Sequence, residues 1–304
     1  MKNYEYRTVL KGKLEQIKSD NKDIVDLINS LNCRDSYKNL YVIFLANLRK
    51  IGISDEIYRK VEKMILDESN VQRTVDEHEC LFGSSMEDRE ICTFDEMMTT
   101  CLEKNEVRFY EDALKYVIDQ SENCKDKGNV IDNFLRYAVA HNYDEVEYDI
   151  WEDANMTNYY ECTLYGYPLG RVFLDTMQTT DGREFFSPES LHIRKNLQGL
   201  RLGAFLLQKM MKDMDEKHPN EPLVSPTVMI SNVNALKLYD SLGAKVYVGE
   251  EMVEDPINGM DHSVKGNCYV VFMPDTIKKY ANTAIEKPIR KINDIKEDRG
   301  NSER

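Results

Sequence analysis

Apolar residues recur every three to four positions through most of the first 140 residues, which is the period of amphipathic helices. Residues 36–48 form one compact apolar helix, and Gly52 is placed to end it. Ser54 is placed to cap the next helix, in which residues 57–65 carry apolar side chains at helical spacing. We therefore expect an all-helical N-terminal region.

Three more helices are predicted before residue 142. Thr93 and Glu96 have the spacing of a capping box, which would begin a helix just before Met97. Apolar residues within 109–118 predict another amphipathic helix, and Asn129 starts one more.

The pattern changes at about residue 142, where Val146, Tyr148 and Ile150 alternate with polar residues as in a strand. Two further strands are expected at 159–164 and 171–177, with Gly166 and Pro168 between them as in a hairpin. Later segments alternate, with strands expected at 190–194, 227–231, 245–248 and 268–273, and helices at 200–214 and 235–242. This alternation predicts an α/β fold with a mixed, partly parallel central sheet flanked by helices.

A chain of 304 residues has room for two domains. The patterns predict a helical accessory domain at 1–140 and an α/β domain at 141–280. Residues 281–304 are charged and lack an apolar period, so we expect a partly disordered tail there.

The composition is that of a soluble globular protein, with 41% hydrophobic and 31% charged residues. No apolar stretch follows the first Lys, and the longest apolar run, 40–46, is far shorter than the ~20 residues of a membrane helix. We therefore expect a cytoplasmic protein without a membrane span. The net charge of −14 argues against general affinity for nucleic acid or anionic membranes.

The seven cysteines are scattered, their number is odd, and no Cys-x-x-Cys pair occurs. His78 and Cys80 lie close together, but no second pair follows at zinc-finger spacing. We expect reduced thiols and no metal site.

Candidate chemistry appears in residues 191–207. A strand ends near Arg194, and a turn with Gln198 and Gly199 leads directly into a helix. A helix N-terminus offers backbone N–H groups and the positive end of a dipole, and glycine lets an anion approach that backbone. The stretch is a candidate pyrophosphate cradle, although a tight turn with close helix–sheet packing would show the same pattern.

A second motif lies about thirty residues downstream, and it makes the first one more specific. It comprises Asn232, Ala235, Leu238, Tyr239 and Gly243, with Ala244 after them. The first motif comprises Gln198, Gly199, Leu200, Arg201, Leu202 and Gly203. Because the two motifs occur in this order and at this separation, residues 145–275 resemble the GNAT family of N-acetyltransferases. Arg201 stands where that family has its first motif glycine, which puts the pyrophosphate geometry in question. Gly199 and Gly203 do not form the Gly-x-Gly-x-x-Gly pattern of a dinucleotide-binding enzyme.

The resemblance implies transfer of an acetyl group to a primary amine, with acetyl-CoA as co-substrate. It also implies that the end of the fourth strand binds the pantetheine arm and polarises the thioester, while the following turn holds the pyrophosphate. The implied cofactor residues are Leu191, His192, Ile193, Gln198, Gly199, Leu200, Arg201, Leu202, Gly203, Ala204, Asn232 and Ala235.

Two catalytic residues follow from the same resemblance. Tyr239 matches the tyrosine that protonates the departing CoA thiolate, and a packed helix tyrosine is the alternative. Glu189, four residues before Ile193, is the candidate base, and Ser187 occupies the other position where members carry one. His192 should point to the opposite face by strand alternation. Thr227, expected at the start of the fifth strand, cannot serve as a base.

The acceptor is left open. Residues 250–265 join the last two strands and contain five acidic residues against one Lys. If this segment lines the entrance to the active site, its negative charge would attract a small cationic amine or a basic peptide. A loop that is simply solvated would have the same composition. Acyl-chain length and oligomeric state are also open.

Two other hypotheses stay open. A chain that binds acetyl-CoA without catalysis would be a sensor or interaction module, which Arg201 and Thr227 favour and Tyr239 opposes. Alternatively, the helical region binds a protein partner or forms a homodimer, and the transferase modifies that partner.

Overall fold

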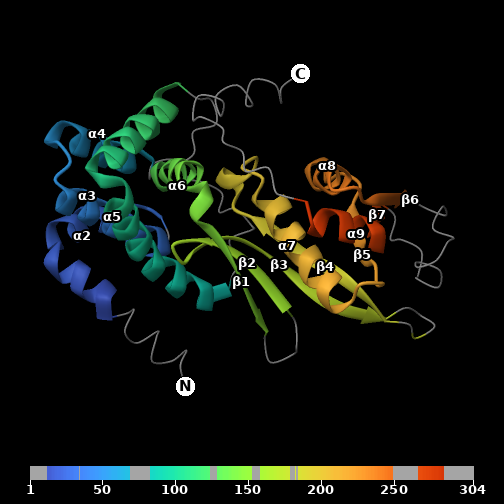
Figure 1. Cartoon of the computed structure of the whole chain (residues 1–304). Coiled ribbons are helices and arrows are strands. Elements are labelled where there is room, and N and C mark those ends of the chain that lie inside the picture. The colour runs from blue at the N-terminus through green and yellow to red at the C-terminus, as the bar shows by residue number, and fades with distance from the viewer. Residues whose placement is uncertain are drawn as a thin grey trace. The chain divides into compact units, whose positions relative to one another are not determined.

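The computed structural model describes residues 12–33, 35–68, 83–123, 129–152, 158–178, 182, 184–248 and 266–283. The chain divides into two compact units (Figure 1). Unit 1 contains the residues up to Val146 and the turn Leu164–Tyr167, and unit 2 contains Glu147–Thr163 and Pro168–Ile289. The tail expected at 281–304 lies outside the described residues from position 284 onward.

Unit 1 is built from helices, which confirms the all-helical N-terminal region. Residues 12–20 are helical, and they are followed by α2 (Lys22–Asn29), α3 (Asp35–Ile51), α4 (Asp55–Glu68), α5 (Gly83–Asn123) and α6 (Val130–His141). The ring of Phe44 lies 5.1 Å from that of Phe134 and 6.5 Å from that of Phe94. These buried rings come from α3, α6 and α5, so they join three helices in one core.

Three helix boundaries follow the predicted signals. Gly52 comes directly after α3 with φ 78, a conformation that glycine adopts easily. Ser54 directly precedes α4. The side chain of Asn129 accepts a hydrogen bond from the Asp132 N–H at 2.7 Å, so it caps α6 as expected.

The capping box predicted at Thr93 and Glu96 is wrong. Both residues lie inside α5, which begins ten residues earlier, and Thr93 is buried. Its neighbours Phe94, Met97 and Met98 are fully buried. Packing of this apolar face holds Thr93 and its neighbours within the helix, and tertiary contacts of this kind outweigh a local start signal. The break in α5 falls instead at Glu106 (φ 63, ψ 178).

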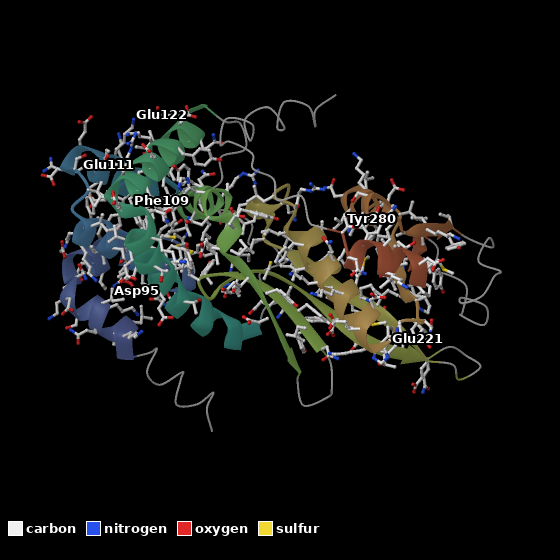
Figure 2. The ribbon with its side chains drawn as sticks, in the orientation of Figure 1. Asp95, Phe109, Glu111, Glu122, Glu221 and Tyr280 are labelled. Atoms are coloured by element: carbon white, nitrogen blue, oxygen red, sulfur yellow. The ribbon has the colours of Figure 1, made fainter. Side chains whose placement is uncertain are left out.

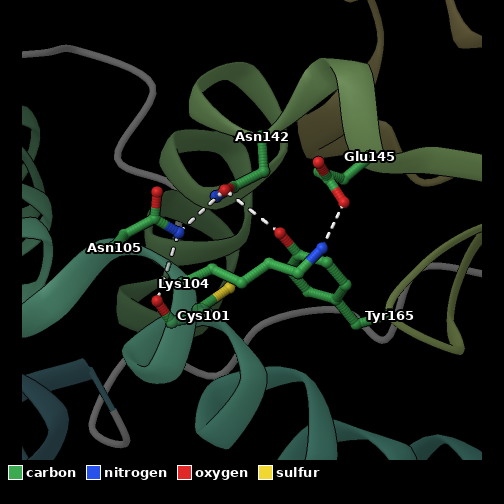
Figure 3. Close-up of polar contacts among 6 residues, drawn as sticks. All are labelled: Cys101, Lys104, Asn105, Asn142, Glu145 and Tyr165. Carbon is green, nitrogen blue, oxygen red and sulfur yellow. Dashed lines mark hydrogen bonds and ion pairs between the residues drawn. The ribbon is translucent and has the colours of Figure 1, made fainter.

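Asn142 joins three parts of unit 1 (Figure 3). Its amide donates to a carbonyl one turn earlier in α6 at 2.9 Å, and its Oδ1 accepts from Asn105 at 2.8 Å and from the Tyr165 hydroxyl at 3.3 Å. Nearby, Lys104 forms an ion pair with Glu145 and lies 4.9 Å from the Tyr165 ring. The kinked α5, the end of α6 and the 164–167 turn are therefore linked around one side chain that is 6% exposed.

Unit 2 contains a seven-stranded sheet in the order β1-β2-β3-β4-β5-β7-β6. The strands are β1 (Val146–Glu152), β2 (Asn158–Leu164), β3 (Tyr167–Gln178), β4 (Glu184–Ile193), β5 (Leu223–Met229), β6 (Lys245–Val248) and β7 (Asn267–Phe272). β4 and β5 are parallel, whereas β3 and β4, β5 and β7, and β6 and β7 are antiparallel. The predicted mixed, partly parallel sheet is confirmed.

Three of these strands begin at least four residues earlier than predicted. β3 starts at Tyr167 rather than at 171, so Pro168 lies in this strand and not between two strands. β4 starts at Glu184 rather than at 190, and β5 starts at Leu223 rather than at 227. Each early part contains a proline, which weakens a strand pattern in sequence. In β5, Pro226 falls where the register with β7 shifts between Ser225 and Val228, a place where a ladder tolerates it. Thr227 therefore lies near the end of its strand, not at its start.

Three helices complete unit 2: α7 (Leu202–Lys217), α8 (Val233–Ser241) and α9 (Pro274–Ala281). α7 covers one face of the sheet (Figure 1). The Tyr160 hydroxyl of β2 donates to Asp213 of α7 at 2.6 Å, and the Tyr148 ring of β1 lies 6.3 Å from that of Phe205. α9 was not predicted from the sequence.

Candidate active site

The strands β4 and β5 separate soon after they begin. Their parallel ladder contains one Cα pair, Phe186 with Leu223, although β4 continues to Ile193 and β5 to Met229. On their other sides, β4 pairs with β3 and β5 pairs with β7. The middle of the sheet therefore opens toward the carboxyl ends of these strands, the edge at which α/β sheets bind ligands.

A bulge in β4 changes which side chains face this opening. Ser190 has φ 50, and the register with β3 runs Phe173 to Glu189 and then Arg171 to His192. One β3 residue therefore faces two β4 residues. Because paired residues share a face, Glu189 and His192 lie on the same face of the sheet. The expectation that His192 points to the opposite face is wrong, since simple alternation does not cross a bulge.

The face that carries Glu189 also carries aromatic side chains. Phe173, its cross-strand partner, lies with its ring 4.4 Å from that of Tyr159 in an edge-to-face contact. The guanidinium of Arg171 lies 5.0 Å from the Phe173 ring. α7 packs on the other face, so these residues flank the opening from the side opposite that helix.

The turn before α7 contains two residues in the left-handed backbone conformation. Gly199 has φ 84, and Arg201, directly before α7, has φ 61 and ψ 13. The left-handed conformation at position 201 explains why a glycine suits this place. Leu202, Gly203 and Ala204 form the first turn of α7, whose N–H groups have no partner within the helix. The N–H of Leu200, in contrast, donates to Leu197 at 3.2 Å.

Gly203 brings α7 close to β4 and α8. A Cβ atom at this position would lie 3.0 Å from Leu238 of α8, 3.7 Å from Ile193 and 3.8 Å from Leu191. The side chains of Leu191 and Ile193 thus pack beneath the start of α7. The backbone edge of β4 at these two residues therefore faces the opening between β4 and β5.

The second motif forms α8. Asn232 caps this helix, because its side chain accepts a hydrogen bond from the Ala235 N–H at 3.1 Å. Tyr239 is 5% exposed, and its ring packs 5.9 Å from that of Phe272. Burial, together with the negative charge of Glu189, raises the pKa of Tyr239 to about 12. Tyr239 is therefore a neutral hydrogen-bond donor at every ordinary pH.

Glu189 is held by a neighbour on its own strand. The buried Ser187 hydroxyl donates to the Glu189 carboxylate at 2.5 Å, and Glu189 itself is partly exposed. Ser187 is thus a partner of the candidate base rather than a base.

An open pocket of about 500 Å³ lies at the carboxyl end of β5. It is lined by Met229, Ile230, Ser231, Gly266 and Asn267. Met229 is 59% exposed, and the pocket adjoins Asn232, where α8 begins. This pocket is formed by the end of β5 and the start of β7, which pairs with β5 on the side away from β4.

Comparisons with known proteins find only distant structural likenesses. No family model and no curated protein matches the chain. Among solved structures, Arabidopsis thaliana Naa50 in complex with a bisubstrate analogue containing CoA is 18% identical, with 37% of this chain and 70% of that chain aligned and a TM-score of 0.28. The ribosomal-protein-S18-alanine N-acetyltransferase of Escherichia coli is 17% identical, with 45% and 84% aligned and a TM-score of 0.26. A Bordetella pertussis protein described as a GNAT-family acetyltransferase is 16% identical, with 54% and 87% aligned and a TM-score of 0.29.

At these identities and TM-scores the likeness carries no argument about this chain's family, activity or acceptor. The candidate site is therefore argued from the geometry of unit 2 itself. That unit places the two sequence motifs side by side, because Gly203 of the first lies against Leu238 of the second.

Gly170 is a site residue that sequence reasoning missed. It pairs with Ile193, and a Cβ atom there would lie 2.7 Å from the His192 carbonyl and 2.4 Å from the Ile193 side chain. Only glycine lets β3 approach the end of β4 this closely. A lone glycine within a strand pattern was the available signal.

Other predictions fall on parts that the structure leaves undescribed. The acidic segment 250–265 lies outside the described residues, as does the side chain of Thr227. Within the described residues, no group of three or more His, Cys, Asp or Glu side chains is placed to hold a metal ion. No helix in that part of the chain has the length and apolar character needed to cross a membrane.

Proposed function

We propose that this chain is an acetyl-CoA-dependent N-acetyltransferase. The observation that carries the proposal is the opening between β4 and β5, with the left-handed turn before α7 at one side and Tyr239 of α8 at another. An extended pantetheine arm can replace the missing ladder by bonding to the inner edges of the two strands. The turn at 199–204 then receives the pyrophosphate through backbone N–H groups.

In the proposed reaction, a neutral primary amine attacks the thioester carbonyl carbon. Backbone N–H groups of β4 near the bulge stabilise the oxyanion of the tetrahedral intermediate. Glu189, directly or through water, accepts the proton that the amine nitrogen loses. The C–S bond then breaks, and CoA leaves as a thiolate that takes its proton from water.

Tyr239 acts in this scheme as a hydrogen-bond donor to the departing sulfur. Burial and the charge of Glu189 raise its pKa to about 12, so the phenol stays protonated and can donate a hydrogen bond to the developing thiolate. The resemblance implies a further step, in which the phenol passes its proton to the sulfur, whereas the scheme here needs only the hydrogen bond.

The proposed acceptor is a primary amine on a small molecule or a peptide. The negative net charge suits a cationic acceptor at long range. On the face beside the opening, Glu189 lies among Phe173, Tyr159 and Arg171, which surrounds the proposed amine position with aromatic and charged groups.

Two measurements test the proposal: calorimetric binding of acetyl-CoA, and thiol release with a panel of amines and basic peptides. Tyr239→Phe should lower kcat by about 10²-fold while acetyl-CoA binding is retained. Tyr247→Phe, on β6, is a matched control that should leave turnover unchanged. Absence of acetyl-CoA binding would refute the proposal. Binding without turnover on any acceptor would instead favour an acetyl-CoA sensor.

A further inference from the structure

The C-terminal helix α9 touches both helices that carry the proposed active site. α7 begins at the proposed pyrophosphate turn, and α8 carries Tyr239. α9 follows directly after β7, and Figure 2 marks Tyr280 on it.

Gln208 ties the end of α9 to α7. Its side chain is 8% exposed, and its Nε2 donates to the Tyr280 carbonyl at 2.7 Å and also to the Thr283 carbonyl. The Tyr280 carbonyl also accepts from the Asn282 and Thr283 N–H groups, so the buried amide of Gln208 adds a link from α7 to the last turn of α9 and to the residues just after it. Loss of this amide would remove both side-chain bonds that join α7 to this end of α9.

Tyr280 ties α9 to the end of α8. Its hydroxyl donates to the Ser241 carbonyl at 3.3 Å. The turn after α8 contains Gly243 with φ 76, and a Cβ atom there would lie 3.0 Å from the Tyr280 ring and 3.2 Å from Thr276. α9 therefore lies directly against this turn.

The same turn is bonded to the backbone of Tyr239. The N–H groups of Leu242 and Ala244 donate to the Tyr239 carbonyl at 3.1 and 3.0 Å. A contact chain thus runs from Gln208 through Tyr280 and the Gly243 turn to Tyr239.

We propose that Gln208 and Tyr280 are positioning residues, which act through α9 to hold α8 so that the Tyr239 hydroxyl reaches the departing sulfur. The kinetic part of this inference rests on the proposed acetyl transfer. The placement of Tyr239 itself can be measured without turnover.

Kinetics on the full chain give the first test. Tyr280→Ala removes the ring and the hydroxyl, and it should lower kcat at least tenfold while the KM for acetyl-CoA stays within twofold. Tyr280→Phe keeps the ring against Gly243 and should restore most of kcat. In a Tyr239→Phe background, Tyr280→Ala should have no further effect, because its effect passes through the lost hydroxyl. An equal loss of kcat in both backgrounds would overturn the proposal.

Titration of Tyr239 gives the second test, which does not depend on activity. Tyrosine labelled at Cζ is followed by NMR, and Tyr239→Phe assigns the resonance. In Tyr280→Ala and Gln208→Leu, the pKa of Tyr239 should fall from about 12 toward 10 as α8 loosens and water reaches the phenol. Lys278→Ala, an exposed change on the same helix, should leave it unchanged. If the chain proves not to be a transferase, this shift still decides the positioning role, and an unchanged pKa in both test variants would overturn it.

Discussion

Tyr239 belongs to the second motif and Glu189 to the strand before the first motif, yet the charge of Glu189 adds to burial in raising the pKa of Tyr239 to about 12. The two residues are fifty positions apart in sequence, on α8 and β4. They can interact because α8 packs against the start of α7, which in turn covers the end of β4. One is a neutral donor and the other a carboxylate, the pair of groups that the proposed reaction needs.

The shifted phenol predicts how stability depends on pH. In the unfolded chain Tyr239 ionises near pH 10, whereas in the folded chain it keeps its proton up to about pH 12. The folded state binds this proton more tightly, so the contribution is fully present below pH 10 and is lost as pH rises through 12. The free energy of unfolding of the wild type should therefore fall more between pH 9 and 12 than that of Tyr239→Phe. Urea titrations at several pH values measure this, and equal losses would contradict it.

Gly170→Ala should damage the end of β4. Its Cβ atom would collide with the backbone of His192 and the side chain of Ile193, so the strands must move apart. We expect a loss of about 1–3 kcal/mol in the free energy of unfolding and weaker acetyl-CoA binding. Gly12→Ala is the control, because its Cβ atom meets open space on a helix, where alanine is favourable. Thermal unfolding and calorimetry distinguish the two variants.

Arg201 is held in a left-handed conformation that favours glycine. Arg201→Gly should therefore unfold at higher denaturant concentration than Arg201→Ala, with a difference of about 1 kcal/mol in the free energy of unfolding. Both variants lose the same charged side chain, so the comparison isolates backbone strain. If the alanine variant is equally stable, the strain is absent.

Asn232 has two separable roles. Asn232→Ala removes the cap of α8 and should cost about 1 kcal/mol of stability. Asn232→Asp keeps an oxygen that accepts from the Ala235 N–H, so stability should be retained. The resemblance also implies that Asn232 contacts the cofactor, and the aspartate lacks its amide donor, so calorimetry should show weaker acetyl-CoA binding. Unchanged affinity in Asn232→Asp would limit this residue to capping.

In unit 1, Asn142→Leu should lower the free energy of unfolding by about 2–3 kcal/mol. The substitution leaves the Asn105 amide and the Tyr165 hydroxyl without this buried acceptor. Asn220→Leu changes an exposed asparagine and should be nearly neutral. Chemical denaturation followed by circular dichroism compares them, and a neutral Asn142→Leu would show that the contacts around Asn142 add no stability.

The sequence predicted what depends on short-range order. Asn129 is followed by an amphipathic stretch, and it caps α6 as expected. The strand–turn–helix around Gly199 and the helix that follows Asn232 were likewise predicted, because turn glycines, capping side chains and apolar periodicity act over a few residues. Both GNAT-like motifs are contained in such short segments.

Failures occurred where distant residues decide the local conformation. Thr93 has the chemistry of a helix start, but burial of its neighbours places it inside α5. Strict alternation put His192 on the wrong face, because the bulge at Ser190 is visible only when β4 is paired with β3. The helix α9 was missed, since its one buried side chain, Ile277, gives no apolar period, and its contacts with Gln208 and Gly243 are made only in the tertiary structure.

By itself, the sequence determined the order of the strands, that of most helices and the two motifs, because local periodicity and turn chemistry specify them. The tertiary structure decided how those motifs meet. The gap between β4 and β5, the shared face of Glu189 and His192, and the burial that raises the pKa of Tyr239 all arise from strand pairing and helix packing between segments far apart in the chain. Such long-range contacts depend on the shape of the whole sheet, and no short window of sequence contains that shape.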